Sequence, residues 1–391
     1  MRFLHTSDWH LGRSFHQVGL LDAQAQLVDH LVSTVRSEQV DAVLVAGDIY
    51  DRAMPAPETV QLLSESVTRL IDAGATVLLS SGNHDSAIRL GFAHELLARA
   101  GLHIRSSVAS IGTPVMVKDV AVYPLPYLEP SVACAPLASA DRTHAGVLGA
   151  ALARVRVDRQ RRARSVVMAH AFVTGGATTD SERDISVGGV SAVHPRVFAG
   201  HDYVALGHLH GRQRVGEHLR YSGSPLALSF SEAGQTKGSW LVDLDDDGVH
   251  VQAVDSPVAR PLATIRGDLD SILADPALTH AERAWCQVTL TDPARPLGAM
   301  ERVRRRFPHT LELRFDPQGM AVPVRRYAER VEAHDDVDVC CQFLEHVRGG
   351  ARASAQERAL LARAVESVRV GAARHDDEGQ LGHNRATAGA A

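Results

Sequence analysis

The N-terminal part of the chain alternates short apolar runs with stretches in which apolar residues recur at helical spacing. Residues 42–46 and 76–80 are continuous apolar runs of strand length. Helical spacing covers residues 20–38 and 57–73, and a further helix is expected around 91–100. Continuous apolar strands separated by helices are typical of a parallel sheet that is covered on both faces. This part of the sequence therefore predicts a buried α/β sheet with right-handed crossovers.

The middle of the chain predicts a second group of strands. An arginine-rich helix is expected at 148–164. The β-like runs lie at 115–126, 166–169, 203–206, 220–224, 239–244 and 249–254. Together with the N-terminal part, these strands indicate an α/β (α+β) fold in which two stacked, mixed β-sheets are flanked by helices, giving four layers.

Pro257 and Pro261 mark a boundary after these strands. The next residues have the pattern of a small α+β unit that contains a basic helix at 298–307. Residues 324–370 are mostly helical and amphipathic, whereas residues 371–391 contain few large apolar side chains and are expected to be disordered. We therefore expect four segments, at 1–260, 261–323, 324–370 and 371–391.

The composition is that of an ordinary soluble protein, with 45% hydrophobic and 22% charged residues. The net charge of −5 gives no hint of nucleic acid, so any phosphate partner must be met by local patches or by metal. The four cysteines include no CxxC pair, which argues against a structural zinc site and fits a reducing cytoplasm. We find neither a signal-peptide pattern nor an apolar run long enough to cross a membrane, so we expect a cytoplasmic protein without membrane contact.

Polar side chains of the kinds that bind metal ions follow five of the predicted strands. They are Asp8, His10, Asp48, Asn83, His170, His208 and His210. Because the carboxyl ends of strands in an open α/β sheet lie along one edge, these side chains are expected to converge in one cleft. Oxygen and nitrogen donors without sulfur suit Mn, Fe, Zn or Mg. The set is large enough for two ions if Asp48 bridges them.

Each of these pieces also has an ordinary structural explanation. An Asp-x-His sequence is usually a loop, a Gly-Asp pair is usually a turn, and a His-x-His pair on a strand end is often a solvated surface feature. Asn83 or Asp85 would also serve as a helix cap. The appearance of all the pieces in order, each after an apolar strand, favours the metal site.

Four of these motifs resemble the signature of the calcineurin-like metallophosphoesterase superfamily. They are Asp8-x-His10, Gly47-Asp48-x-x-Asp51, Gly82-Asn83-His84-Asp85 and Gly207-His208-x-His210. The resemblance implies that Asp8, His10, Asp48 and His210 hold one ion, and that Asp48, Asn83, His170 and His208 hold the other. It also implies that His84 is catalytic rather than a ligand. An imidazole, with an ordinary pKa of about 6.5, suits the protonation of a leaving oxygen.

A narrower resemblance, over most of residues 1–260, is to the SbcD family of bacterial nuclease subunits. It rests on the stretches Met1–Arg13, Gly47–Arg52, Gly82–Ser86, Ala169–Gly175, Ser181–Arg183, Val187–Gly189, Tyr203–Gly211 and Tyr221–Pro225. The family cuts DNA with two divalent ions, most often Mn²⁺, in recombination, replication and repair. The resemblance implies an ATP-dependent double-strand 3′–5′ exonuclease and a single-strand or hairpin endonuclease. It further implies a homodimer within a heterotetramer that contains an SbcC-type ATPase.

The same resemblance suggests roles for the C-terminal third. Residues 261–323 would cap the site and orient DNA, with Arg302, Arg304, Arg305 and Arg306 as candidate DNA contacts. Residues 324–370 would bind the ATPase, with Val339, Phe343, Leu344 and Val347 as candidate partner contacts. The sequence leaves open that these arginines are a solvated helix face and that the helices pack on their own domain. It also leaves open a phosphatase of small phosphoesters or phosphoproteins, and a non-catalytic scaffold.

Overall fold

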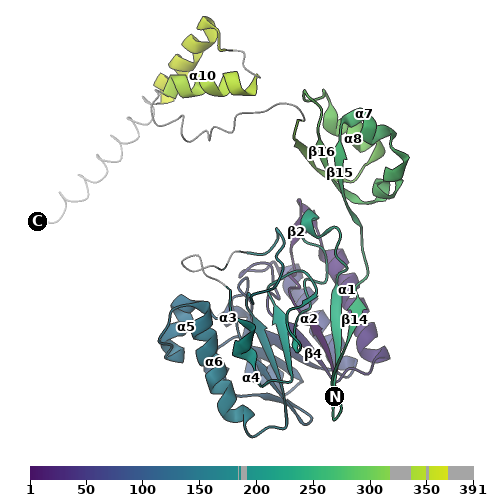
Figure 1. Ribbon diagram of the computed structural model, residues 1–391, viewed down its shortest axis with the longest axis vertical. Helices are drawn as coiled ribbons and strands as arrows, with labels where there is room; N and C mark the ends of the chain where they lie inside the picture. Colours follow the sequence, from purple (N-terminus) through teal and green to yellow (C-terminus); the bar gives the residue numbers. More distant parts are fainter. Residues whose placement is uncertain (184, 186–191, 318–335, 349–351, 369–391) are drawn as a thin grey trace, which may run out of the picture. The chain divides into compact units, whose positions relative to one another are not determined.

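The computed structural model describes residues 1–183, 185, 192–317, 336–348 and 352–368 (Figure 1). The chain divides into two compact units, Met1–Gln318 and Gly319–Ala391, which we describe one at a time. Residues 371–391, for which the sequence predicts disorder, lie outside the described residues, as do parts of the predicted segment 324–370.

One six-stranded sheet of the first unit has the strand order β14-β13-β1-β4-β5-β6. Its strands are β1 (Arg2–Thr6), β4 (Ala42–Ala46), β5 (Thr76–Ser80), β6 (Leu102–Arg105), β13 (Gly238–Asp245) and β14 (Gly248–Asp255). Strands β1, β4, β5 and β6 are parallel, and β13 runs antiparallel to β1. Helices α1 (Leu21–Ser37) and α2 (Pro57–Asp72) cover one face, where Leu27 of α1 and Val43 of β4 share a core.

The second six-stranded sheet has the order β11-β12-β10-β9-β8-β7. Its strands are β7 (Val115–Val117), β8 (Val120–Pro124), β9 (Arg164–His170), β10 (Tyr203–Gly207), β11 (Gln213–Arg214) and β12 (Leu219–Tyr221). Helices α5 (Pro130–Leu137) and α6 (His144–Arg159) pack on it. The helix predicted at 148–164 ends earlier than expected because Arg164 already pairs with Val120 as the first residue of β9.

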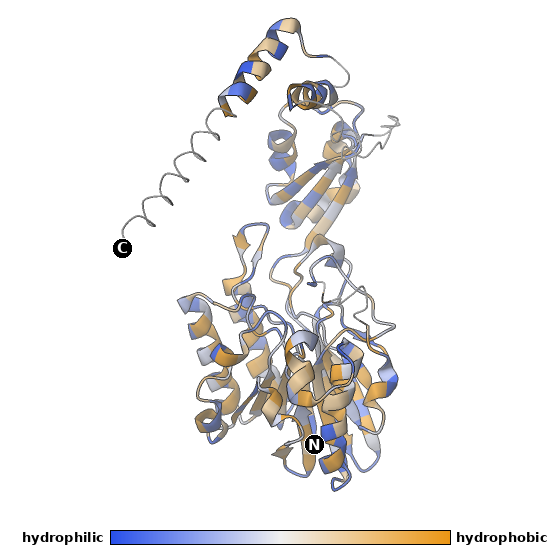
Figure 2. Ribbon diagram, turned by 90° about the vertical axis from the view of Figure 1, so that its left-hand side faces the viewer, coloured by the Kyte–Doolittle hydropathy of each residue, from blue (hydrophilic) through white to orange (hydrophobic). Residues whose placement is uncertain are grey.

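The two sheets stack face to face. Phe3 and Leu44 of the first sheet lie in one buried cluster with Val166 and Tyr203 of the second. The layers therefore run helices, sheet, sheet, helices (Figure 1), and the strands are largely apolar in the hydropathy view of Figure 2. This arrangement confirms the predicted fold class of two stacked mixed sheets flanked by helices.

Two local features differ from the prediction. The helix expected around 91–100 is two short helices, α3 (Ala87–Leu90) and α4 (His94–Ala98). Ala93, with a φ of +56°, separates them, because a continuous helix does not pass through that conformation. A small hairpin of β2 (Ser14–Phe15) and β3 (Val18–Gly19), which the sequence did not predict, follows the Asp8-x-His10 motif.

A three-stranded parallel sheet completes the first unit. It consists of β15 (Leu262–Gly267), β16 (Trp285–Leu290) and β17 (Thr310–Phe315), with helices α7 (Leu269–Ala274) and α8 (Ala299–Arg306). Val288, Val303 and Phe307 lie in its own hydrophobic core. The short 3-10 helices of the unit are η1 (Val108–Ser110), η2 (Pro195–Phe198), η3 (Phe230–Glu232) and η4 (Pro276–Arg283).

The described part of the second unit is helical. It contains α10 (Asp336–Val347) and a helical stretch at residues 355–368, and Arg348 forms an ion pair of 2.8 Å with Glu357. Among the described residues of the whole chain, none of the helices has both the length and the apolar character that crossing a membrane requires.

Candidate metal centre

The predicted ligands lie at the carboxyl ends of five strands, β1, β4, β5, β9 and β10. His170 is the last residue of β9, and the other ligands lie in the loops that follow their strands. The structure brings all of these residues together at one edge of the stacked sheets. The carboxylates and imidazoles are buried, whereas Asn83 is half-buried. The residues that meet there are Asp8, His10, Asp48, Asn83, His170, His208 and His210.

Four of these residues have a backbone conformation that is costly outside glycine. The φ angles of Asp8, His10, Asp48 and His208 are +51°, +43°, +47° and +102°. Hydrogen bonds between the loops hold this backbone, because the amides of Asp8 and His10 donate to the carbonyls of Gly47 (3.1 Å) and Asp48 (3.0 Å). Strained non-glycine residues that gather in one place are typical of functional sites.

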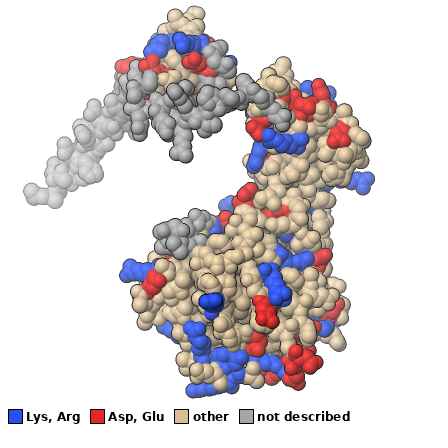
Figure 3. Space-filling model, in the orientation of Figure 1, with Lys and Arg blue, Asp and Glu red and all other residues tan. Residues whose placement is uncertain are grey.

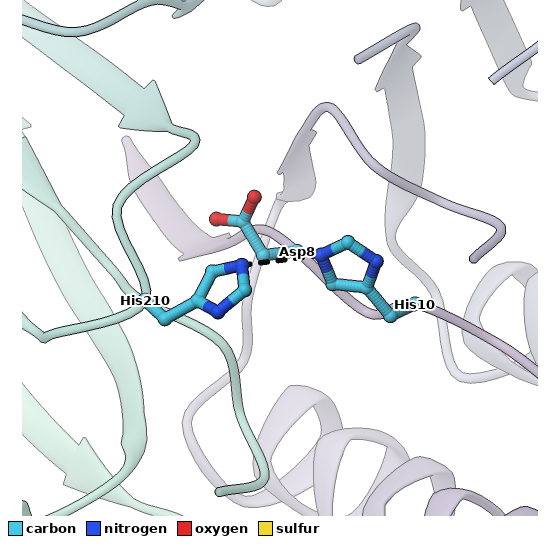
Figure 4. Close-up of side chains that lie close together, drawn as sticks. All are labelled: Asp8, His10 and His210. Carbon is cyan, nitrogen blue, oxygen red and sulfur yellow. Dashed lines mark hydrogen bonds between the residues drawn. The ribbon is translucent and has the colours of Figure 1, made fainter. Parts of the chain in front are cut away.

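One cluster consists of Asp8, His10 and His210, whose potential ligand atoms all lie within 4.8 Å of one another. Figure 4 shows the two imidazoles facing each other beside the Asp8 carboxylate. Their Nε2 atoms are 3.2 Å apart. The amide of His208 donates to both Asp8 oxygens, at 3.0 and 3.2 Å, and so fixes the carboxylate.

A second cluster centres on Asp48 and His170. The His170 Nδ1 lies 3.1 Å from the carbonyl of Ala46, which can only accept, so Nδ1 carries a proton and Nε2 is the atom that faces the cluster. That Nε2 lies 3.5 Å from Asp48 Oδ2 and 2.8 Å from Asn83 Oδ1. The ring of His208 is next to that of His170, with 5.3 Å between centroids. A third cluster joins Asp48 to His10 and His84, so Asp48 lies between the two groups.

The electrostatics of this site favour a bound cation. Burial raises the pKa of Asp8 to about 6. Burial also acts to raise the pKa of Asp48, but His170 and other imidazoles outweigh it and hold that pKa well below its usual value. Burial lowers the pKa of His208 to about 3, so its ring is neutral. Burial acts to lower the pKa of His170, but the Asp48 and Asp8 carboxylates outweigh it and raise that pKa to about 9. Carboxylates that gather with imidazoles in a buried site are a donor set for a divalent metal.

The hydrogen bonding of the site fits the same interpretation. Asn83 Nδ2 is buried without a hydrogen-bond partner, which is uncommon for a buried polar atom, and His10 Nδ1 has only Asp51 Oδ1 beside it, at 3.4 Å. Two imidazole nitrogens that face each other at 3.2 Å next to a carboxylate are more fully satisfied by a shared cation than by one another. The residues present therefore fit divalent metal ions.

His84 adjoins this group, with its ring centroid 4.6 Å from that of His10. Its amide donates to Asp48 Oδ1 at 2.8 Å, and its Nδ1 lies 2.8 Å from the carbonyl of Asp51. Because a carbonyl only accepts, Nδ1 carries the proton and Nε2 is the free basic nitrogen. Burial lowers the pKa of His84. The exposed Arg183 is its neighbour, with a guanidinium nitrogen 3.5 Å from Nδ1.

Comparison with known protein families identifies the family to which the chain with these site residues belongs. The family model for calcineurin-like phosphoesterases matches residues 1–212, which contain every residue of the site. The chain belongs to the calcineurin-like phosphoesterase family. A second model, SbcD_C, described as the type 5 capsule protein repressor C-terminal domain, matches residues 258–348. The two matches together support an SbcD-type nuclease subunit and confirm the resemblance found in the sequence.

Solved structures with similar folds are distant from this phosphoesterase. TT1561 of Thermus thermophilus is 12% identical over 64% of this chain and 98% of its own, with a TM-score of 0.39. A dimetal phosphatase from Danio rerio is 13% identical over 66% of this chain and 96% of its own, with a TM-score of 0.40. GAP50, described as the anchor in the inner membrane complex of Plasmodium, is 10% identical over 81% of this chain and 98% of its own, with a TM-score of 0.38.

Sequence reasoning missed the role of Asp85 in the phosphoesterase site. Its carboxylate accepts the amides of Ile49 (3.0 Å), Tyr50 (2.9 Å) and Gly82 (2.9 Å), and so joins the loops after β4 and β5. The sequence suggested a helix cap here, but Ser86 caps α3 instead. Asp85 accepts amides from a loop far away in the chain, so no local pattern reveals this contact.

The arginines predicted to contact DNA lie on α8 and are paired within their own sheet unit. Arg306 binds the carbonyls of Ile272, Leu273 and Asp275, and Arg304 binds that of Thr310. Arg302 pairs with Asp270 and Arg305 with Glu301 at the surface. Acidic and basic side chains are interspersed on the face shown in Figure 3.

The candidate partner contacts lie on α10 of the second unit. Phe343 and Val347 are exposed, whereas Val339 and Leu344 are half-buried. Two large apolar side chains thus face solvent on one short helix.

Proposed function

We propose that this chain is the nuclease subunit of an SbcCD-type complex and cuts DNA with two divalent ions, Mn²⁺ in our proposal. The observation that carries the proposal is the pairing, in one chain, of a phosphoesterase site with an SbcD C-terminal domain. Members of the phosphoesterase family hydrolyse phosphoesters with two divalent metals. The proposed biological setting is DNA recombination, replication and repair in the cytoplasm.

The proposed ligand sets follow the two clusters. Asp8, His10, Asp48 and His210 hold one cation, and Asp48, Asn83, His170 and His208 hold the other. Two cations so placed neutralise phosphate charge and lower the pKa of a water molecule. The buried carboxylate of Asp48, in contact with both clusters, is the shared ligand. The strained loops hold these side chains in place before substrate arrives, which reduces the cost of ordering them on binding.

In this proposal, His84 is the catalytic acid. The Asp51 carbonyl orients the ring by accepting the Nδ1 proton, so that Nε2 faces the site. A protonated Nε2 donates to a phosphate oxygen and then gives its proton to the leaving oxygen. The neighbouring Arg183 adds positive charge near the same position.

The proposal that the substrate is DNA rests on residues outside the metal centre. We propose that Arg302 and Arg305, which lie on the exposed surface of α8, contact DNA phosphates, and that Arg304 and Arg306 mainly hold the helix in place. The exposed apolar side chains of α10 are proposed to bind the ATPase partner. Ile88, Phe92 and Leu96 are also exposed and supply a candidate surface for the homodimer.

One assay distinguishes this function from a small-phosphoester phosphatase and from a non-catalytic scaffold. The full chain is incubated with Mn²⁺ and either hairpin or single-stranded DNA, beside para-nitrophenyl phosphate, and the variants His84→Ala and Asp48→Ala are measured in parallel. DNA cleavage that is lost in both variants supports the nuclease. Turnover of the small ester alone supports the phosphatase. No turnover of either substrate, with or without an SbcC-type partner, contradicts both enzymatic functions.

A further inference from the structure

Side chains outside the proposed ligand set form hydrogen bonds to the backbone and to Nδ1 of His210. We call Ser181, Glu182, Glu232 and Lys237 the His210 network. The amide of His210 donates to Glu182 at 2.8 Å, and its carbonyl accepts from Lys237 Nζ, also at 2.8 Å. Its Nδ1 lies 2.5 Å from Ser181 Oγ. Every hydrogen-bonding group of His210 except Nε2 is therefore engaged by this network, and Nε2 is the atom that faces His10.

The network continues from Ser181 to a buried ion pair. Ser181 Oγ donates to Glu232 Oε1, and Glu232 Oε2 pairs with Lys237 Nζ. Glu232 is 1% exposed and Lys237 is 8% exposed. Lys237 is one of only two lysines in a chain that otherwise uses arginine, and the other, Lys118, lies at the surface. A buried pair costs desolvation, so its position beside His210 calls for an explanation.

The protonation of the network follows from donor and acceptor counting. Glu232 forms a buried ion pair with Lys237, so its carboxylate is ionised and only accepts. Ser181 has a single proton, which it donates to Glu232. Its oxygen must then accept from His210, which places the imidazole proton on Nδ1. The Nε2 atom is left with a lone pair directed at the Asp8 and His10 cluster.

We propose that Glu232, acting through Ser181, fixes the tautomer and orientation of His210 and thereby sets the affinity of the metal site that His210 completes. His170 and His84 turn Nδ1 toward backbone carbonyls, whereas His210 turns Nδ1 toward the Ser181 hydroxyl, which is bonded to the charged Glu232. A carboxylate behind an imidazole raises its basicity, so this ligand binds a cation more strongly. The inference deepens the proposed function and rests on the ligand role of His210. Ser181 and Glu232 are positioning residues.

The test is a Mn²⁺ titration of the full chain at neutral pH, in which the electron paramagnetic resonance signal of free Mn²⁺ reports the bound fraction. Ser181→Ala and Glu232→Gln are expected to weaken one of two sites by about 10–100-fold, the usual effect of removing such a partner. Ser181→Thr restores the hydroxyl and is expected to recover most of the affinity. Ser231→Ala is the control, because Ser231 bonds the amide of Asp180 in the same loop and does not touch His210.

A second readout does not involve metal. The ¹⁵N shifts of the His210 ring, assigned with His210→Asn, are expected to show the Nδ1–H tautomer in the wild type and a mixture in Ser181→Ala. If Glu232→Gln fails to fold because Lys237 is left unpaired, Glu232→Gln combined with Lys237→Met removes both charges, and Ser181→Ala remains decisive in any case.

The outcomes separate this inference from the proposed function. If His210→Ala binds both ions as the wild type does, the ligand assignment is wrong. If His210→Ala loses an ion while folded Ser181→Ala and Glu232→Gln keep wild-type affinity for both, the ligand assignment stands and the inference is overturned. An unchanged His210 tautomer in Ser181→Ala also overturns it.

Discussion

The Nε2 atoms of His10 and His210 lie 3.2 Å apart although the residues are 200 positions apart in the sequence (Figure 4). The loop after β1 supplies one ring and the loop after β10 the other, so the two sheets must be assembled before this pair exists. A cation that binds both rings thus binds only the folded chain. Metal binding and stability should therefore be linked.

We predict that Mn²⁺ stabilises the chain against unfolding and that a chelator reverses the effect. With free metal at about 100 times the dissociation constant, each site adds about 2.7 kcal/mol to the free energy of unfolding. Thermal unfolding with Mn²⁺ and with chelator measures the difference. In His10→Ala the stabilisation is expected to be smaller, and an equal stabilisation of this variant contradicts the assignment of His10.

His84→Gln is expected to separate catalysis from metal binding. The variant removes the proton donor and leaves the proposed ligands in place, so kcat for DNA cleavage should fall about 10²–10⁴-fold. Titration with Mn²⁺ is expected to give the wild-type affinity for both ions. Loss of an ion in this variant would mean that His84 is a ligand.

Gly82→Ala tests how closely the loop after β5 approaches Asp48. An added Cβ at Gly82 would lie 2.1 Å from Asp48 Oδ1 and 2.2 Å from its amide nitrogen. Asp48, the proposed shared ligand, must then move, and we expect at least a tenfold loss of Mn²⁺ affinity with a destabilisation of about 1–3 kcal/mol. Gly149→Ala in α6 is the matched control, because its Cβ would meet nothing within 4 Å. Equal Mn²⁺ affinity in the two variants contradicts the prediction.

The buried His5 predicts how stability depends on pH. Burial lowers its pKa from 6.5 to about 3, and the ring contacts the Tyr203 hydroxyl at 2.9 Å. At His5 the unfolded chain binds a proton more readily than the folded one. The contribution of His5 to the free energy of unfolding is therefore complete above pH 6.5. It falls by about 1.4 kcal/mol for each pH unit between 6.5 and 3.

Denaturant unfolding of wild type and His5→Phe over that pH range measures the effect. The variant is expected to be less stable at neutral pH, but its free energy of unfolding should fall less steeply on acidification. Parallel curves for the two proteins would show that His5 titrates normally in the fold.

Much of the fold and of the candidate site follows from local sequence. Apolar runs such as β4 and β5 are buried on both faces, so strand positions and the edge at which Asp48 and Asn83 lie are encoded in neighbouring residues. Contacts made across the fold are not encoded in this way. Ser181 lies in a loop without periodicity and meets His210 only when the sheets stack, and the Asp85 contacts arise in the same manner.

Magnetic coupling between bound Mn²⁺ ions tests the central claim most directly. Two ions that share Asp48 lie about 3.5–4 Å apart and therefore couple. At two equivalents of Mn²⁺, the electron paramagnetic resonance spectrum of the wild type is predicted to show an exchange-coupled pair, and that of Asp48→Asn only isolated ions. A wild-type spectrum of isolated ions, or the same coupled spectrum in Asp48→Asn, would contradict a two-metal centre bridged by Asp48.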